Sequence, residues 1–208
     1  MAVLTRKEIF GLIKAGSLSF RPALDKFQLQ AHSVDLRIGF TFVLAKTWAL
    51  TPSGRVALKV DYGENRKYLE RIKLKAGQYF EILPGEFIGI ETLEEIKIPA
   101  GLMAVLYPRS SINRRGLSVD LSGIIDAGYE GKLLVPVRNN TASQIIQIFP
   151  GERFCQVVFE DLASPVLKDN GRYQNKEIGI GVLKEKSRIE EKLVRTGKIF
   201  ELKKHFQL

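Results

Sequence analysis

Hydrophobic positions near the N-terminus recur at helical spacing. Ile9, Leu12 and Ile13 fall on one face of a helix, and Thr5–Glu8 has the Thr-x-x-Glu spacing of a capping box. Gly16 follows as a stop signal. The pattern predicts one short helix whose apolar face packs on the rest of the protein.

Further along, from about Ser33 to Leu162, the pattern changes to short runs rich in β-branched and aromatic residues. Turn signals containing Pro, Gly and Asn separate these runs. Many short strands at such spacing are typical of an all-β sandwich, jelly roll or barrel. The predicted strands are Phe40–Ala45, Arg55–Val60, Tyr79–Leu83, Phe87–Glu91, Leu102–Leu106, Lys132–Val137 and Phe154–Phe159.

An internal echo occurs within this region. Leu83–Phe87 resembles Phe149–Arg153, since each contains Pro-Gly-Glu and precedes a predicted strand. The echo indicates two comparable halves, as in a double Greek key. It is equally explained if Pro-Gly-Glu is simply a common turn, and both interpretations stay open.

After Pro165 the chain becomes polar, and it ends in a charged segment that Gly197 interrupts. This pattern predicts two short helices or one broken helix. We therefore expect residues 1–165 to form a distorted, jelly-roll-like β-barrel with a short N-terminal helix. Residues 166–208 are expected to form a tail with a C-terminal helical extension.

The formal net charge of +9 raises the question of nucleic-acid binding. Nucleic-acid binders gather Lys and Arg on one face, whereas the basic stretches Arg66–Lys75 and Lys184–Lys204 also carry Glu. A positive field instead favours small polyanions such as nucleoside triphosphates. No apolar run approaches the ~18 residues of a membrane span, and the single cysteine, Cys155, excludes an internal disulfide. We expect a cytoplasmic protein that binds neither nucleic acid nor membrane.

Several standard catalytic patterns are missing from the sequence. It has no Gly-rich loop ending in Lys-Ser or Lys-Thr, and one cysteine cannot build the zinc site of zinc-dependent deaminases. Neither His32 nor His205 has a partner at metal-ligand spacing. Catalysis must therefore use Asp, Ser, Arg and Gln, with or without a divalent cation.

One polar stretch, Tyr107–Gly116, follows an apolar strand and suits phosphate binding. Arg109 stands beside Ser110 and Ser111, so a guanidinium group and two hydroxyls are available to phosphate oxygens. A capped surface turn with solvated arginines is the alternative.

A second stretch, Gly123–Gly131, combines an acid, an aromatic residue and glycines that let a ligand approach the backbone. Asp126 is suited to orient a water molecule, and Tyr129 to pack on a flat ring or a sugar. Taken alone, this stretch is also compatible with an ordinary turn.

Taken together, the chain resembles the dUTPase and dCTP deaminase superfamily from about residue 1 to residue 175. Four motifs of that superfamily occur in order, and the approach to the first, Gln30–Gly39, resembles the deaminase branch in particular. The four are Ser33–Gly39, Pro108–Ser111, Gly123–Gly131 and Gly151–Gln156.

The resemblance implies a homotrimer with active sites at subunit interfaces, a deoxypyrimidine nucleoside triphosphate as substrate, and Mg²⁺ carried on the triphosphate. It implies that Asp35 helps to hold the Mg²⁺, through water, and that the hairpin after Gly131 reads the base. It further implies phosphate binding by Arg109, Ser110, Ser111 and Gln156, water activation by Asp126, and nucleoside binding by Tyr129, Gly128 and Ile125.

Two reactions occur in the superfamily, and one residue bears on the choice. Deaminase-branch enzymes carry a glutamate ten residues after the aspartate of the third motif, and Pro136 occupies that position here. Proline cannot shuttle the proton that attack at C4 of cytosine requires. Ser110 and Arg114 still resemble deaminase site residues. Hydrolysis by a water held at Asp126 needs no such shuttle.

We therefore predict hydrolysis of dUTP to dUMP and diphosphate. One alternative is a dCTP deaminase, alone or combined with diphosphatase activity, if another acid replaces the missing glutamate. A second alternative is a catalytically silent regulator that binds deoxynucleotides. The C-terminus lacks the Gly-rich lid of typical dUTPases, and Gly171–Gln174 instead resembles the closing stretch of the deaminase branch.

Overall fold

The computed structural model describes residues 2–58, 69–120, 123–166 and 188–206. The chain divides into two compact units. The larger comprises Met1–Ala45 and Glu70–Ile178, and the smaller comprises Lys46–Leu69 and Gly179–Leu208. The predicted division of the chain into residues 1–165 and 166–208 stays a prediction.

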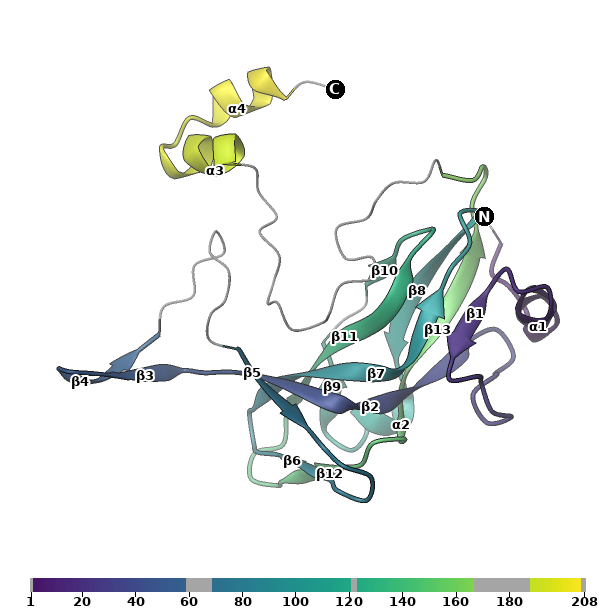
Figure 1. The fold of residues 1–208 in the computed structure, drawn as a ribbon, viewed down its shortest axis with the longest axis horizontal. Coiled ribbons are helices and arrows are strands. Elements are labelled where there is room, and N and C mark those ends of the chain that lie inside the picture. Colours follow the sequence, from purple (N-terminus) through teal and green to yellow (C-terminus); the bar gives the residue numbers. More distant parts are fainter. Residues whose placement is uncertain (1, 59–68, 121–122, 167–187, 207–208) are drawn as a thin grey trace. The chain divides into compact units, whose positions relative to one another are not determined.

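Among the described residues, nine strands form one curled sheet in the order β10-β8-β13-β2-β7-β11-β9, with β1 paired to β7 and β5 to β2 (Figure 1). A short two-stranded sheet, β6 with β12, accompanies it. The strands are β1 (Ser19–Arg21), β2 (Val34–Ala45), β5 (Leu69–Lys73), β6 (Phe80–Ile82), β7 (Phe87–Lys97), β8 (Leu102–Pro108), β9 (Leu117–Val119), β10 (Ile124–Ile125), β11 (Glu130–Asn139), β12 (Ile146–Ile148) and β13 (Arg153–Asp161).

The core lies on the inner face of this curled sheet. Along β7, every second side chain from Ile88 to Ile96 is buried, which is the alternation expected of a strand with one face on the core. Phe42, Phe154 and Phe159 are the largest fully buried side chains. The predicted all-β, jelly-roll-like barrel with a short N-terminal helix is confirmed.

The N-terminal helix, α1 (Arg6–Lys14), forms as its sequence predicts. The backbone N–H and the hydroxyl of Thr5 both donate to Oε2 of Glu8, at 2.7 and 2.8 Å. Ile9 is fully buried in the core, and Gly16 has a positive φ of 72° directly after the helix. The capping box therefore sets where the helix begins, and Ile9 attaches it to the sheet.

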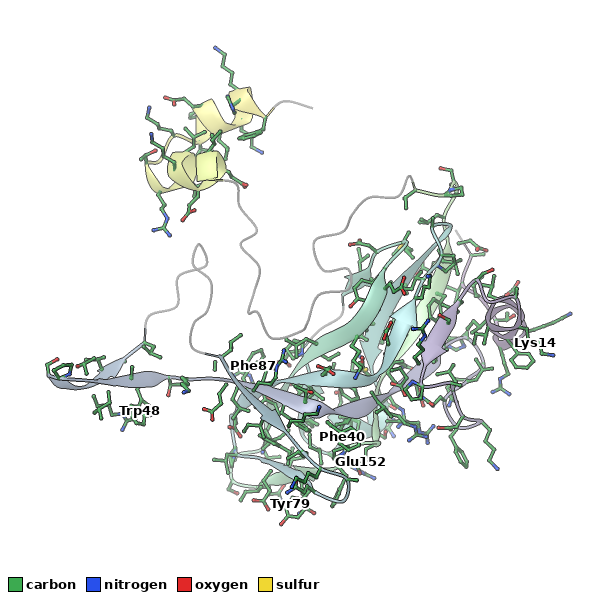
Figure 2. All side chains as sticks on the ribbon, viewed as in Figure 1. Lys14, Phe40, Trp48, Tyr79, Phe87 and Glu152 are labelled. Carbon is green, nitrogen blue, oxygen red and sulfur yellow. The ribbon has the colours of Figure 1, made fainter. Side chains whose placement is uncertain are left out.

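The two Pro-Gly-Glu segments occupy equivalent places in the fold. Each follows one strand of the β6–β12 pair and leads into a long strand of the main sheet, β7 or β13. In the first turn the N–H of Leu83 donates to the Glu86 carboxylate at 2.8 Å. In the second, the N–H of Phe149 donates to the carboxylate of Glu152, at 2.9 Å. Glu152 is labelled in Figure 2. The echo in the sequence thus corresponds to two matching turns, which favours two comparable halves.

The smaller unit contains a hairpin and two helices. The hairpin pairs β3 (Trp48–Thr51) with β4 (Gly54–Ala57). The predicted strand Arg55–Val60 overlaps β4 alone, and residues 59–60 lie outside the described residues. The helices are α3 (Arg188–Arg195) and α4 (Ile199–His205). Gly197, with a φ of 71°, lies between them and confirms the predicted interruption. None of the helices in the described parts of the chain is long and apolar enough to cross a membrane.

Strands β2 and β7 approach each other closely at Gly39. A Cβ atom at this position would lie 2.6 Å from the carbonyl oxygen of Glu91 and 2.9 Å from that of Thr92. Both contacts are to backbone, and the β2–β7 register also shifts between Ile38 and Phe42. A side chain at Gly39 would therefore force the two central strands apart.

We expect Gly39→Ala to lower the free energy of unfolding by about 1–3 kcal/mol, because backbone must move to admit the methyl group. Gly11→Ala is the matched control, since a Cβ at this exposed position of α1 meets nothing within 4 Å. The control should raise stability by about 0.5–1 kcal/mol through helix propensity. Denaturant titration of both variants measures the difference, and equal stabilities would contradict the close approach.

Candidate active site

Three of the four motifs meet on adjacent strands. Strand β13 lies between β8 and β2, and Gln156 pairs in register with Tyr107 on one side and with Asp35 on the other. The first motif on β2, the second at the end of β8 and the fourth on β13 are therefore neighbours. Side-chain hydrogen bonds join them as well: Ser33 Oγ donates to Gln156 Oε1 at 3.2 Å, and Gln156 Nε2 donates to the Pro108 carbonyl at 3.3 Å.

A buried carboxylate lies at the centre of this meeting point. Asp35 is 2 % exposed, and its Oδ2 lies 3.1 Å from Nε of Arg109 and 3.0 Å from Nη1 of Arg153. Arg109 also donates from Nη1 to the Arg153 carbonyl at 3.1 Å. Burial raises the pKa of Asp35, and the positive charges of the two arginines oppose that rise. Asp35 thus holds the guanidinium group of Arg109 in a fixed place.

These contacts bear on the predicted role of Asp35 toward Mg²⁺. The cation prefers oxygen ligands, and Oδ2 of Asp35 is already occupied by guanidinium groups. Among the described residues, no three His, Cys, Asp or Glu side chains are grouped so that they could hold a metal. A Mg²⁺ ion would have to take its ligands from the substrate phosphates and water, so the water-mediated contact to Asp35 stays a prediction.

The predicted phosphate-binding residues gather where β8 ends. Helix α2 (Ser110–Asn113) begins directly after Arg109, whose backbone N–H donates to the Phe154 carbonyl at 3.3 Å. Ser110 and Ser111 are exposed in its first turn. Arg114 follows the helix, and its N–H donates to the Ser110 carbonyl at 3.0 Å. The predicted phosphate-binding residues and Arg114, which with Ser110 resembles deaminase site residues, therefore lie at the same end of β8.

The third motif lies on β10 (Ile124–Ile125) and the turn after it, and β10 pairs with β8 at some distance from Arg109. Strand β10 pairs with β8 through Ile125 and Ala104, and the exposed Asp126 follows it directly. Arg109 lies five positions beyond Ala104, which at ~3.3 Å per residue is roughly 16 Å. One copy of the chain therefore does not bring Asp126 to the phosphate-binding residues.

Around Asp126, the chain makes a tight turn that contains the predicted nucleoside-binding residues. The N–H of Tyr129 donates to the Asp126 carbonyl at 3.1 Å, and Gly128 adopts a φ of 77° that the turn requires. The Tyr129 hydroxyl donates to the Lys132 carbonyl at 2.6 Å. Burial raises the pKa of Tyr129 to about 12, so the phenol stays protonated at neutral pH. Ile125 is buried, so its side chain belongs to the core.

Pro136 lies on β11, between β7 and β9. Its carbonyl accepts from the N–H of Asp120 at 2.9 Å, so its missing N–H would have faced the same side. Regular pairing of β9 with β11 ends at Val119 and Val137, one step before the proline. The chain thus tolerates Pro136 because the neighbouring strand ends there. The bulge in β11 occurs elsewhere, between Lys132 and Leu134.

Sequence reasoning missed a buried acid that supports the first motif. Glu94 is 1 % exposed; its Oε1 accepts from Nε2 of Gln28 at 2.7 Å and its Oε2 from the N–H of Arg37 at 2.9 Å. The alternation of β7 was a usable signal, because Glu94 stands on the same face as the buried Ile88 and Ile96. Burial raises the pKa of Glu94. Arg153 was missed as well, although it lies inside the fourth motif.

The raised pKa of Glu94 predicts a particular pH dependence of stability. The folded state binds the Glu94 proton more tightly than the unfolded chain does, so its contribution is complete at acidic pH and is lost as pH rises through the folded pKa. We expect the melting temperature of the wild type minus that of Glu94→Gln to fall from about pH 4 to about pH 8.

Thermal unfolding at several pH values measures this difference. Glu95→Gln is the control, because Glu95 is the next residue on β7 and faces the opposite side of the strand. A difference between wild type and Glu94→Gln that stays constant with pH would show that ionisation of Glu94 does not affect folding.

Comparison with known proteins identifies the family. The profile of the dCTP deaminase-like family matches residues 3–162, so the chain belongs to that enzyme family, as its motifs suggested. It is 34 % identical to a protein of Persephonella marina named dCTP deaminase, dUMP-forming, over 83 % of this chain and 91 % of that protein. A protein of Methanosphaera stadtmanae with the same name is 32 % identical, over 82 % of this chain and 85 % of its own.

Among solved structures, the fold is similar to that of 2′-deoxycytidine 5′-triphosphate deaminase from Agrobacterium tumefaciens, with a TM-score of 0.58 and 22 % identity. The match covers 76 % of this chain and 48 % of that one, so the chain spans about half the length of the solved relative. This likeness supports the fold.

The relatives correct the predicted reaction. The absence of a glutamate at Pro136 favoured hydrolysis of dUTP as the activity. Relatives that are 30–35 % identical over most of the chain are, however, named dCTP deaminase, dUMP-forming. The prediction of dUTP hydrolysis as the reaction is therefore wrong, and the findings favour the alternative of a deaminase combined with diphosphatase activity. Gly171–Gln174, the predicted closing stretch, lies outside the described residues.

Proposed function

We propose that the protein converts dCTP to dUMP in one active site. Water replaces the amino group at C4 of cytosine and releases ammonia, and a second water then attacks the α-phosphate and releases diphosphate. The observation that carries this proposal is the dUMP-forming dCTP deaminase activity in the names of relatives that cover most of the chain. Two groups of residues support the proposal: those at the end of β8, and those in the turn after β10, which contains Asp126.

The phosphate end of the substrate binds where β8 ends. Arg109 donates to phosphate oxygens, and its guanidinium group is held in position by Asp35, so little ordering is needed on binding. The exposed hydroxyls of Ser110 and Ser111 add donors next to it. Gln156 keeps the end of β8 in place through its bond to Pro108. Mg²⁺ bound to the triphosphate would neutralise charge on the phosphate oxygens and on the leaving diphosphate.

Hydrolysis of the α-phosphate uses the third motif. The exposed carboxylate of Asp126 orients a water molecule and accepts its proton, and the ring of Tyr129 packs on the deoxyribose. A water at Asp126 and a phosphate at Arg109 must meet in a single substrate, yet roughly 16 Å of β8 separates the two places in one copy. The active site is therefore completed by a second copy of the chain in a homotrimer.

The reaction can be tested with purified protein, Mg²⁺ and dCTP. We expect ammonia, diphosphate and dUMP in equal amounts, with little free dUTP. Asp126→Asn should slow diphosphate release by about 100-fold or more, because the attacking water loses its base. Asp161→Asn, an exposed acid at the end of β13, is the control and should behave as wild type. Diphosphate release without ammonia would contradict the proposal.

The shared site predicts complementation between inactive variants. Arg109→Gln and Asp126→Asn each damage every site of a homotrimer. When the two proteins are unfolded and refolded together, some interfaces combine an intact Arg109 from one copy with an intact Asp126 from another. We expect diphosphate release to reappear in the mixture and to remain absent when each variant is refolded alone. No recovery, with mixed trimers detected by mass spectrometry, would place the whole site in one copy.

A further inference from the structure

The proposed function leaves deamination without an acid–base residue at position 136. Attack of water at C4 of cytosine needs a group that takes a proton from the water and returns it to the leaving amine. Proline offers no such group, and its register partner on β7 is Gly89. If deamination occurs, as the proposed function requires, another residue near position 136 must supply this group. Strand β9 lies on the other side of Pro136 from β7.

Asp120 lies directly opposite Pro136. The β9–β11 register runs through Ser118 with Arg138 and Val119 with Val137, so the next pair is Asp120 with Pro136. The N–H of Asp120 donates to the Pro136 carbonyl at 2.9 Å. Residues opposite each other in an antiparallel pair point to the same face, with Cβ atoms about 5 Å apart.

Burial shows which face the two side chains share. Val119 and Val137 are buried in the core, whereas Asp120 is exposed and Pro136 is half-buried. The alternation of both strands therefore directs Asp120 and Pro136 away from the core. A carboxylate directly after β9 thus occupies the face, and the neighbourhood, where a glutamate at position 136 would lie.

The carboxylate of Asp120 is also held in a defined orientation. The Ser118 hydroxyl donates to its Oδ1, and Nε of Arg138 lies 3.6 Å from its Oδ2. Arg138 is itself placed by the ring of Phe87, 5.4 Å from the guanidinium carbon to the ring centroid. Ser118 and Arg138 act as positioning residues, so the acid is part of an ordered outer-face cluster of Phe87, Ser118, Asp120 and Arg138.

We propose that Asp120 is the acid–base residue of deamination, in place of the glutamate of the deaminase branch. Its carboxylate takes a proton from water as the water oxygen bonds to C4, and that proton passes to N3 of the ring. The second water proton then moves through Asp120 to the amino nitrogen. The C4–N bond breaks, ammonia leaves, and a C4 carbonyl remains, so that cytosine and water give uracil and ammonia with Asp120 unchanged.

Asp120→Asn tests this role, because it keeps the shape of the side chain and removes the carboxylate that accepts the proton. With dCTP as substrate, we expect ammonia release to fall by about 100-fold or more. With dUTP as substrate, diphosphate release should stay within about twofold of wild type, because Asp126 performs that step. Asp161→Asn should leave both rates unchanged. Circular dichroism and the melting temperature establish that each variant is folded.

The double variant Asp120→Asn/Pro136→Glu returns a carboxylate to the same face from the opposite strand. We expect it to recover ammonia release by about tenfold or more over Asp120→Asn alone, an effect that a purely structural role of Asp120 would not produce. If Asp120→Asn alone does not fold, a folded double variant that fails to deaminate overturns the proposal. Normal ammonia release from folded Asp120→Asn overturns it too.

These outcomes separate the inference from the proposed function. A wild-type protein that hydrolyses dUTP and leaves dCTP intact overturns the proposed function, and the role of Asp120 with it. A wild-type protein that deaminates dCTP, with Asp120→Asn equally active, overturns the role of Asp120 alone.

Discussion

The ion pairs of Asp35 with Arg109 and Arg153 are the interaction on which the proposed phosphate-binding half of the site depends. The carboxylate is buried on β2, and its partners stand at the end of β8 and the start of β13, so one group joins three strands and three motifs. Loss of one partner of a buried ion pair leaves an uncompensated charge, which costs about 3–5 kcal/mol. The residue that orients Arg109, the proposed phosphate-binding arginine, therefore also holds the strands together, and site and fold are difficult to vary independently.

Local patterns allowed most of the fold to be predicted. The capping box at Thr5, the β-branched and aromatic runs of the long strands and the interruption at Gly197 each depend on neighbouring residues, and each is confirmed. The predicted strands did not include β1, β3, β5, β9, β10 and β12. Four of these six strands have only two or three residues, which are too few to show a period. Their places are set by the strands beside them, and no local pattern encodes that pairing.

The candidate site, too, could be predicted only in part. Its residue types could be recognised from motifs. The distance between Arg109 and the turn of Asp126, roughly 16 Å along β8, could not be predicted. That distance follows from the register of β10 on β8, which depends on contacts between distant parts of the chain. Glu94 was predictable in principle, since an acid at an inward position of an alternating strand must be buried with partners.

Pro136 shows why a missing residue at one position is weak grounds for excluding a reaction. Catalysis requires a carboxylate at a certain point in space, and in a sheet that point is within reach of side chains from neighbouring strands. The groups proposed to bind and hydrolyse the triphosphate would serve both reactions of the superfamily, so they do not distinguish between the two reactions. In the proposed deamination, the choice depends on which carboxylate can reach the cytosine ring. The β9–β11 register, continued by the hydrogen bond from the Asp120 N–H to the Pro136 carbonyl, places Asp120 opposite Pro136. A comparison of linear motifs examines position 136 alone. In the folded sheet, Asp120 and Pro136 lie opposite each other, so either position could carry the carboxylate.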